Sequence, residues 1–569
     1  MKHIIVLCFV ILCCCGTLFS QDAHKGKEFY MAVIDAGDEG VFIISSDTVT
    51  KGTILLYRGG TWADTIPFTI QTPHQPTLIE FAPDRYELHG ASSGNPNAFM
   101  HNLQPIKRSV YIRAEHDIQV SYKIGGQAIS PETSLIYPVQ SYGKEYIVIA
   151  PQARYFSKLE NNTLNQRFDY SHCAIVATEN NTSIKIESPV NLIGASERTL
   201  TAILQKGESY LIQARPSPND TTPDMTGMRI SSSLPIAVHT GGIYGFGQHP
   251  TKKGFVPEYV SETLLPVSAY AQRYIVIDPV KSRKEQDLGP NYHKIVAMTD
   301  TATIYVNGNN MGRIKKGEYM FLPLDNYSVV YGTSPIAVVL FRRSSFVTDP
   351  FDNTAELDTY GSPFMTDIAP QEYWQKSYDV MIADFFNLLD GYYTDNYISL
   401  IVPTAALNQM KLNGKAVNKN LFKPLPSFPS SGFCSELSYA TISINPGALR
   451  FECSVPFGIS CYGYGKTLDI FSSYGYVPGR SMNNASLSHP IVKTSVSDTT
   501  ICAGQSLQLQ ANGGDGTFQW SPKEGLSCTD CPSPIATITK DILYTAVSKD
   551  YFGCPTMKQS VSVRVKTAT

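Results

Sequence analysis

Two stretches of the chain, 120 residues apart, share one pattern of hydrophobic and polar positions. Residues 172–187 have the sequence HCAIVATENNTSIKIE, and residues 292–307 have YHKIVAMTDTATIYVN. In each stretch two apolar, β-branched runs flank a polar turn, which carries Asn180 and Asn181 in the first copy and an Asp-Thr pair in the second. Such runs suit a pleated, half-buried surface, and Asn and Asp favour tight turns. The pattern predicts two copies of a β-hairpin inside a repeated, domain-sized unit.

Similar apolar segments fill the rest of the chain. Between residues 25 and 126 the sequence predicts seven strands, separated by Gly, Pro and Asp clusters. The segments are KEFYMAV, GVFIISS, GTILLYR, DTIPFTI, PTLIEFA, SVYIRAE and IQVSYKI. The opening segment returns as GKEYIVIAP at 143–151, as AQRYIVIDP at 271–279 and as QKSYDVMIA at 375–383. Four related units are therefore predicted.

A proline marks the closing hairpin that is predicted for three of the units. The segments MRISSSLPIAVHTGG, VVYGTSPIAVVLF and LRFECSVPFGISCYGYG carry Pro235, Pro335 and Pro456, and the first unit has Asp117 at this point. Proline has no N–H to give to a ladder, so a turn or the start of a strand suits it.

The predicted fold class is all-β, a tandem array of immunoglobulin-like β-sandwich repeats. Seven strands in about 100 residues are typical of a sandwich, whereas the alternative, a β-propeller-like arrangement, typically holds four strands in each blade. The predicted divisions are a signal peptide at 1–20, sandwich units at 21–140, 141–268, 269–372 and 373–480, a linker at 481–489, and a final module at 490–569.

The N-terminus has the pattern of an export signal. A basic start is followed by an apolar run from Ile4 to Cys15 and by small or polar residues up to Ser20. The run is too short to span a bilayer, so no membrane span is predicted in the mature chain. Cleavage after Ser20 is predicted, and the alternative is a lipoprotein signal in which Cys15 is acylated. Both predict a secreted or cell-surface protein.

The composition excludes some classes of partner. The chain has 43% hydrophobic and 17% charged residues and a net charge of −3, which is typical of globular β domains rather than of disorder. It contains no basic run, so neither nucleic acid nor an anionic membrane surface is a predicted partner.

No cluster in the sequence predicts catalysis, a cofactor or a metal. GASSG at 90–94 matches the pattern of a hydrolase nucleophile, but no helix is predicted after it, as that motif requires. His239, like the other histidines, has no metal-ligand spacing. Four carboxylates at 349–358 match no calcium loop, which favours a solvated turn. The long loops 152–168 and 245–262 are binding candidates, because loops on a rigid scaffold commonly carry function.

Several motifs in a fixed order carry a family resemblance. YIVIAP, AIVATENNTSIKI, LQKGESYLIQ and TGMRISSSLPIAVHTGG resemble the N-terminal domain of IgGFc-binding protein and its bacterial relatives. SYGYVPG at 473–479 resembles the terminal motif of that family, so the resemblance covers about residues 25–479. It implies an extracellular binding domain, named for immunoglobulin Fc binding in its animal member, and it supplies no catalytic motif.

The last segment, 490–569, resembles the immunoglobulin-like, PKD-type modules of bacterial surface proteins. Cys502, Trp520 and Cys554 follow in the order of an immunoglobulin sandwich. The resemblance implies a disulfide between Cys502 and Cys554 that clamps strand ends. Cys528 and Cys531 form CTDC, and a local disulfide is predicted there because the chain is exported and a zinc site would need further ligands.

Four other cysteines remain in the mature chain. Cys173 alternates with apolar residues in its predicted strand, which favours a buried free thiol. One disulfide is predicted among Cys434, Cys453 and Cys461, and the sequence does not choose the pair.

The repeat, the export signal and the missing catalytic motif favour a non-enzymatic surface or secreted binding protein. Such an adhesin would bind extracellular protein or glycoprotein, for example an immunoglobulin Fc-like or mucin-like ligand. Two alternatives stay open: a structural stalk of a longer surface protein, and the accessory region of a glycan-acting enzyme. For the latter, Asp352 and Glu356 are the nearest approach to a paired-carboxylate site.

Overall fold

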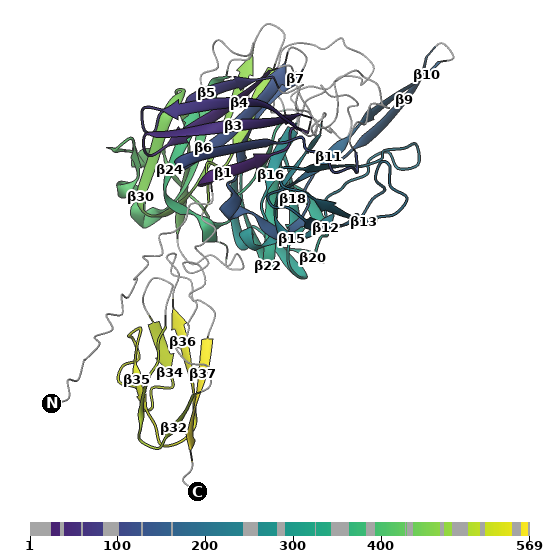
Figure 1. Cartoon of the computed structure of the whole chain (residues 1–569). Coiled ribbons are helices and arrows are strands. Elements are labelled where there is room, and N and C mark those ends of the chain that lie inside the picture. Colours follow the sequence, from purple (N-terminus) through teal and green to yellow (C-terminus); the bar gives the residue numbers. More distant parts are fainter. Residues whose placement is uncertain are drawn as a thin grey trace, which may run out of the picture.

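The computed structural model describes most of the chain. The described residues are 24–34, 39–58, 61–82, 102–126, 129–160, 163–242, 260–280, 291–324, 326–342, 363–382, 393–426, 428, 436–466, 471–480, 499–511, 518–548 and 559–566. Within them the regular structure is β-strand with short 3-10 turns (Figure 1). These turns are η2 (Val139–Ser141), η3 (Val267–Ala269), η5 (Gln371–Tyr373), η6 (Thr404–Gln409) and η7 (Lys419–Leu421). The predicted all-β class is therefore confirmed.

Four antiparallel sheets follow one another along the chain, and each defines a unit. Unit 1 contains β1 (Lys25–Met31), β2 (Glu39–Ser46), β3 (Thr50–Arg58), β4 (Thr61–Ile70), β5 (Thr77–Phe81), β6 (Val110–Gly126) and β7 (Ile129–Ile136). Unit 2 contains β8 (Gly143–Ile147), β11 (Ser171–Ala177), β12 (Thr182–Glu187), β13 (Thr199–Leu204), β14 (Ser209–Gln213), β15 (Arg229–Gly242) and β16 (Val260–Leu264).

The other two units repeat this order. Unit 3 contains β17 (Ala271–Ile277), β18 (Asn291–Ala297), β19 (Ala302–Val306), β20 (Asn309–Ile314), β21 (Tyr319–Leu324), β22 (Tyr327–Phe341) and β23 (Met365–Asp367). Unit 4 contains β24 (Gln375–Ile382), β25 (Tyr393–Pro403), β26 (Lys411–Leu412), β27 (Lys415–Ala416), β28 (Lys423–Pro424), β29 (Leu437–Ile444), β30 (Gly447–Lys466) and β31 (Phe471–Tyr476).

One long strand organises each unit. In unit 1 the first half of β6 lies between β1 and β3, and its second half lies between β2 and β7. Strands β15, β22 and β30 divide in the same way. Alternate residues from all seven strands of unit 1 contribute to a single hydrophobic core, so the sheet curls around its own core. This is a sandwich-like arrangement in which one strand passes through both layers.

The long strands correct the prediction of closing hairpins. SVYIRAE and IQVSYKI are two halves of β6, and the three proline-containing segments are likewise single strands. The prolines lie where the register shifts between the two halves; in unit 2, for example, pairing with β8 passes from Ser231 to Ile236. Pro235 is unpaired at that shift, so its missing N–H costs no ladder bond.

The repeated pattern at 172–187 is not a hairpin either. Strands β11 and β12 do not pair with each other, because β15 lies between them in the sheet. The same holds for β18 and β19 with β22. The predicted turn is present, with Asn181 at a φ of +57°. It connects β11, which pairs with the second half of β15, to β12, which pairs with the first half. Local apolar periodicity predicted the strands and could not predict their partners.

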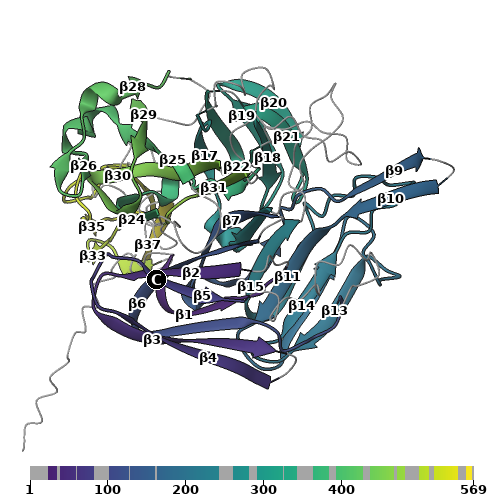
Figure 2. The ribbon, with the colours of Figure 1, turned by 90° about the horizontal axis from the view of Figure 1, so that it is seen from above.

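The four units form a closed ring (Figure 2). Their last strands meet around a common axis: β7 contacts β16 and β31, and β23 contacts β16 and β31. Gly479, just after β31, packs on the His24 ring, just before β1, and a Cβ at Gly479 would collide with that ring. The end of unit 4 is therefore in contact with the beginning of unit 1.

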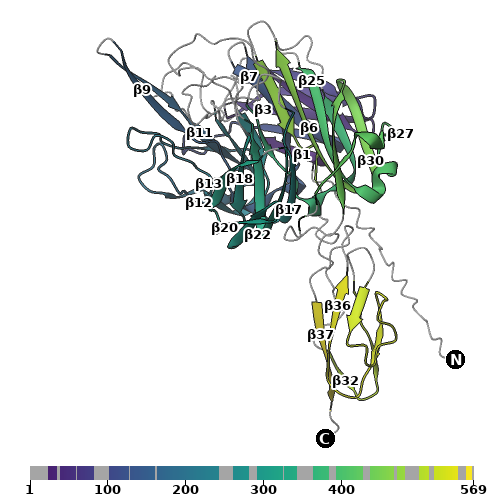
Figure 3. The same ribbon diagram turned by 180° about the vertical axis from the view of Figure 1, so that it is seen from behind.

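The segment 152–168 was predicted as a loop and is largely a β-hairpin. Strands β9 (Arg154–Glu160) and β10 (Thr163–Asp169) pair with each other and with no other strand that the structure describes. The hairpin projects from the ring (Figure 3). Leu159 and Leu164 face each other across it and are largely exposed.

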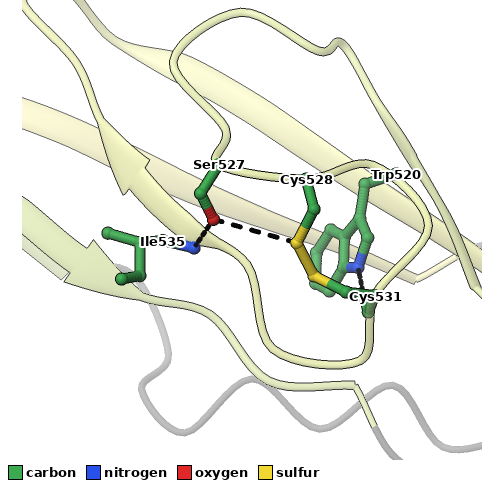
Figure 4. The surroundings of a disulfide bond; sticks show 5 residues. All are labelled: Trp520, Ser527, Cys528, Cys531 and Ile535. Carbon is green, nitrogen blue, oxygen red and sulfur yellow. Dashed lines mark hydrogen bonds between the residues drawn. A yellow bond between two sulfur atoms is a disulfide. The ribbon is translucent and has the colours of Figure 1, made fainter.

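Residues 499–566 form a smaller body of two sheets. Its strands are β32 (Thr499–Cys502), β33 (Ser506–Gln508), β34 (Phe518–Ser521), β35 (Ile535–Thr537), β36 (Ile542–Ser548) and β37 (Gln559–Lys566). A disulfide joins Cys528 to Cys531, and the Trp520 indole N–H donates to the carbonyl oxygen of Cys531 at 2.9 Å (Figure 4). The bridge thus holds the loop over the Trp520 ring, which is buried in the core.

Candidate functional site

Several residues singled out from the sequence lie outside the described part of the chain. These are GASSG at 90–94, the carboxylates at 349–358, and the segment 245–262 up to the start of β16. Cys502 is exposed and unbonded, and Cys554 lies outside the described residues. The pairing of these two cysteines stays a prediction.

The other cysteines are core thiols. Cys173 is a buried free thiol, as predicted. The disulfide predicted among Cys434, Cys453 and Cys461 is wrong, because Cys453 and Cys461 are both free and any such bridge needs one of them. Both point into the core of unit 4 from β30, where Cys453 lies 3.9 Å from the carbonyl oxygen of Ala406. Burial raises the pKa of the Cys461 thiol, so it is unreactive at neutral pH.

A buried lysine joins unit 2 to unit 3. The Lys294 ammonium, on β18, donates to the Ala150 carbonyl oxygen at 2.6 Å, to Asp224 Oδ2 at 2.6 Å and to Thr226 Oγ1 at 2.8 Å. It also lies 5.0 Å from the centre of the Tyr319 ring. Its side chain is 2% exposed. We call this set the lysine seam.

The charges of the lysine seam balance. Burial raises the pKa of the Asp224 carboxyl, but the adjacent Lys294 ammonium and the Thr226 donors outweigh burial, and the pKa is lowered overall. The three acceptors around Lys294 match the three protons of an ammonium group. Gly227 permits the close approach of the units, since a Cβ there would collide with the carbonyl oxygen of Gly317.

A second ion-pair cluster closes the ring between unit 4 and unit 1. Lys25 lies 2.7 Å from Asp379 and 2.9 Å from Asp47, and Arg450 lies 2.9 Å from Asp379. His74 Nδ1 lies 3.4 Å from Asp47 and 3.7 Å from Asp379. The cluster connects residues 354 positions apart in the sequence.

The same cluster has the donor types of a metal site but not its electrostatics. Ligand atoms of Asp47, His74 and Asp379 lie within 4.8 Å of one another, and carboxylate and imidazole suit a divalent ion. The Lys25 ammonium already bonds both carboxylates, and Arg450 bonds one of them. A divalent ion would have to bind beside the positive charges of Lys25 and Arg450. We therefore interpret the cluster as ion pairs that join unit 4 to unit 1.

The axis of the ring holds a third charge cluster, whose Arg480 and Asp367 side chains are buried. Arg480, which is fully buried, bonds Asp367 at 3.0 Å, and the Asp367 N–H donates to Glu262 Oε2 at 3.2 Å. The Tyr270 hydroxyl donates to Asp367 at 3.1 Å, and the Ser134 hydroxyl donates to Glu262 at 3.3 Å. Burial and the nearby Asp367 carboxylate raise the pKa of Glu262 to about 8. Glu262 is therefore mostly neutral at pH 7.

The Glu262 carboxyl predicts a loss of stability in mild alkali. Its folded pKa is raised, so the folded state holds a proton that the unfolded state releases near pH 4.5, and the free energy of unfolding falls as pH rises towards 8. Buried histidines such as His293, whose pKa burial lowers to about 3, reduce the free energy of unfolding only below pH 6.5. They therefore do not contribute to this decline. We expect Glu262→Gln to flatten the decline between pH 6.5 and 8.5 in urea unfolding. An unchanged decline would contradict the assignment.

A cavity opens between unit 3 and unit 4. Its volume is about 540 Å³, and its lining includes Asp278, Asn326, Lys423, Tyr439 and Thr441. Asp278 accepts a hydrogen bond from the Asn291 amide at 2.7 Å. Ser399 is not a lining residue, but its Oγ lies 3.0 Å from Oγ1 of the lining residue Thr441. We call this cavity the seam pocket.

Sequence reasoning missed Lys294, Arg480 and the seam pocket. A signal for Lys294 was present: a charged residue inside the apolar run YHKIVA is unusual unless it is paired. Arg480 follows the terminal SYGYVPG motif, and nothing in its neighbours predicts burial. The seam pocket depends on contacts between units, which no local pattern reports.

The fold and these clusters define an all-β scaffold whose buried charges join units to one another. The chain belongs to the IgGFc binding protein family: the family model described as IgGFc binding protein matches residues 132–463, more than half of the chain. This range runs from β7 of unit 1 to β30 of unit 4.

Comparisons with individual proteins add little. No curated protein matches the chain. The crystal structure of trypsin-activated alpha-2-macroglobulin from Escherichia coli aligns with 8% identity and a TM-score of 0.13, over 96% of this chain and 49% of that one. The BSP domain of a biofilm associated protein aligns with 8% identity and a TM-score of 0.10, over 76% of this chain and 97% of that one. Scores this low carry no argument about fold or function. Among the described residues, no helix is long and apolar enough to span a membrane.

Proposed function

We propose that the chain is a non-enzymatic, secreted or cell-surface binding protein that takes extracellular proteins or glycoproteins as ligands. The observation that carries the proposal is the family match over residues 132–463, since that family is described by its binding of immunoglobulin Fc. An adhesin role fits the predicted export signal. The buried ion pairs between units support it further, because they fix the surfaces of the ring relative to one another.

The test is a binding measurement on the mature chain from Gln21 to Thr569. The immobilised chain is exposed to immunoglobulin G Fc, mucin and a panel of serum glycoproteins, each with and without enzymatic removal of its glycans. We expect saturable binding to at least one protein of the panel. The absence of saturable binding to every protein, or turnover of a polysaccharide by the same chain, would overturn the proposal.

A further inference from the structure

The strand registers place Ser399 of unit 4 where unit 3 has Lys294. In unit 3 Lys294 stands two residues before Val296, which pairs with the second residue after the proline of β22. In unit 4 Ser399 stands two residues before Ile401, which pairs with the second residue after the proline of β30. The two positions are therefore equivalent, and a lysine in one unit is a serine in the next.

The aromatic neighbour of the ammonium is retained. Tyr319 pairs with Val296 on the other side of β18, and Tyr439 pairs with Ile401 on the other side of β25. Tyr319 provides a ring face to the ammonium in the lysine seam. Tyr439, at the equivalent position, lines the seam pocket.

The facing side of the seam is also equivalent. The hydroxyls of Tyr146 and Tyr274 each donate to the carbonyl oxygen of the first residue after the proline of their long strand. Ala150 and Asp278 each stand four residues after that tyrosine and directly before a proline. The carbonyl oxygen of Ala150 accepts from the ammonium of the lysine seam, while Asp278 lines the seam pocket.

Thr226, another acceptor of the lysine seam, also has an equivalent position in unit 3. Thr226 stands three residues before Arg229, which pairs with the residue after Tyr146. Asn326 stands three residues before Val329, which pairs with the residue after Tyr274. Thr226 bonds Lys294 in the lysine seam, and Asn326 lines the seam pocket.

The two seams thus occupy equivalent positions, and the lysine of one is exchanged for a short side chain in the other. By the same register Asp224, the carboxylate of the lysine seam, corresponds to Leu324. The seam pocket keeps an aromatic face in Tyr439 and a polar group in Asn326, and it gains a carboxylate, Asp278, in place of an alanine. A carboxylate and a tyrosine face are the groups that bind an ammonium ion. Lys423 also lines the pocket and favours a ligand with an acceptor beside its ammonium.

We propose that the seam pocket binds a primary ammonium group on an alkyl chain, which is the chemistry of a lysine side chain. Asp278 is the counter-ion, and Tyr439 is the ring over which the cation lies. This inference does not rest on the proposed function, because the binding of a small amine to the chain tests it directly.

The test uses ligand-observed NMR on the mature chain with two probes, Nα-acetyl-lysine methylamide and its uncharged analogue Nα-acetyl-norleucine methylamide. We expect the lysine probe to bind and the norleucine probe to bind at least about tenfold more weakly, the equivalent of about 1.4 kcal/mol. Equal binding of the two probes, or no binding of the lysine probe, would overturn the inference even if a protein ligand were found.

Two variants locate the binding. Asp278→Asn keeps an acceptor for the Asn291 amide, and we expect it to weaken the lysine probe about tenfold or more. Ser399→Lys restores the lysine of the equivalent seam, so we expect it to fold and to exclude the probe. Glu145→Gln, which changes an exposed carboxylate of unit 2, is the matched control and should bind as the parent chain does. Unchanged probe binding in either seam variant, checked for folding by thermal unfolding, would refute the site.

Discussion

Replacing Lys294 by methionine is expected to lower the free energy of unfolding by about 3–5 kcal/mol, because it leaves the buried Asp224 carboxylate without its cationic partner. Methionine has a similar length, so the loss measures the charge and not a cavity. The Asp224 carboxyl would then have to be protonated in the folded state or stay charged in a buried site. Equilibrium unfolding in urea at pH 7, with the midpoint and the slope both fitted, measures the change.

An exposed lysine supplies the control. Lys185 forms a 2.8 Å ion pair with Glu187, and both side chains are about half exposed. Lys185→Met should therefore change the free energy of unfolding by less than about 1 kcal/mol. If Lys294→Met were as mild as Lys185→Met, the lysine seam would not be a structural ion pair.

Arg480→Met is the second substitution that we expect to lower the free energy of unfolding strongly. Arg480→Met removes the cation that faces Asp367 at the axis, where the arginine is fully buried. The cost should again be about 3–5 kcal/mol, since the carboxylate of Asp367 is left in a buried site. Differential scanning calorimetry of the mature chain measures the shift in the unfolding transition.

The comparison for Arg480 is Arg450, whose side chain is 37% exposed and whose partner Asp379 also bonds Lys25. Arg450→Met should cost less than about 1 kcal/mol. Equal shifts for the two variants would mean that the axis cluster does not hold the ring together.

The class of fold followed from local pattern, and the pairing of strands did not. Alternating apolar residues and turn signals predicted β11, β12, β18 and β19 at close to their observed positions. Periodicity reports which residues face the core but not which strand lies alongside. The sequence therefore supported a hairpin at 172–187, whereas β15 in fact inserts between its two arms.

The sites were less predictable because they depend on contacts between units. Asp224 and Lys294 are 70 residues apart, and Lys25 and Asp379 are 354 apart. A search for motifs with short spacing cannot find such pairs. The order of several motifs, among them YIVIAP and AIVATENNTSIKI, did predict the family, and the family model matches residues 132–463, a shorter range than the predicted 25–479.

Carbodiimide cross-linking of the mature chain tests the closed ring most directly. This reagent joins an amine to a carboxylate in contact without a spacer, and Lys25 contacts both Asp47 of its own unit and Asp379 of unit 4. Mass spectrometry of the monomer should find Lys25 joined to Asp47 and to Asp379. Lys25 joined to Asp47 and never to Asp379 would contradict the contact between unit 4 and unit 1 that closes the ring. It would indicate an open, linear arrangement of the four units.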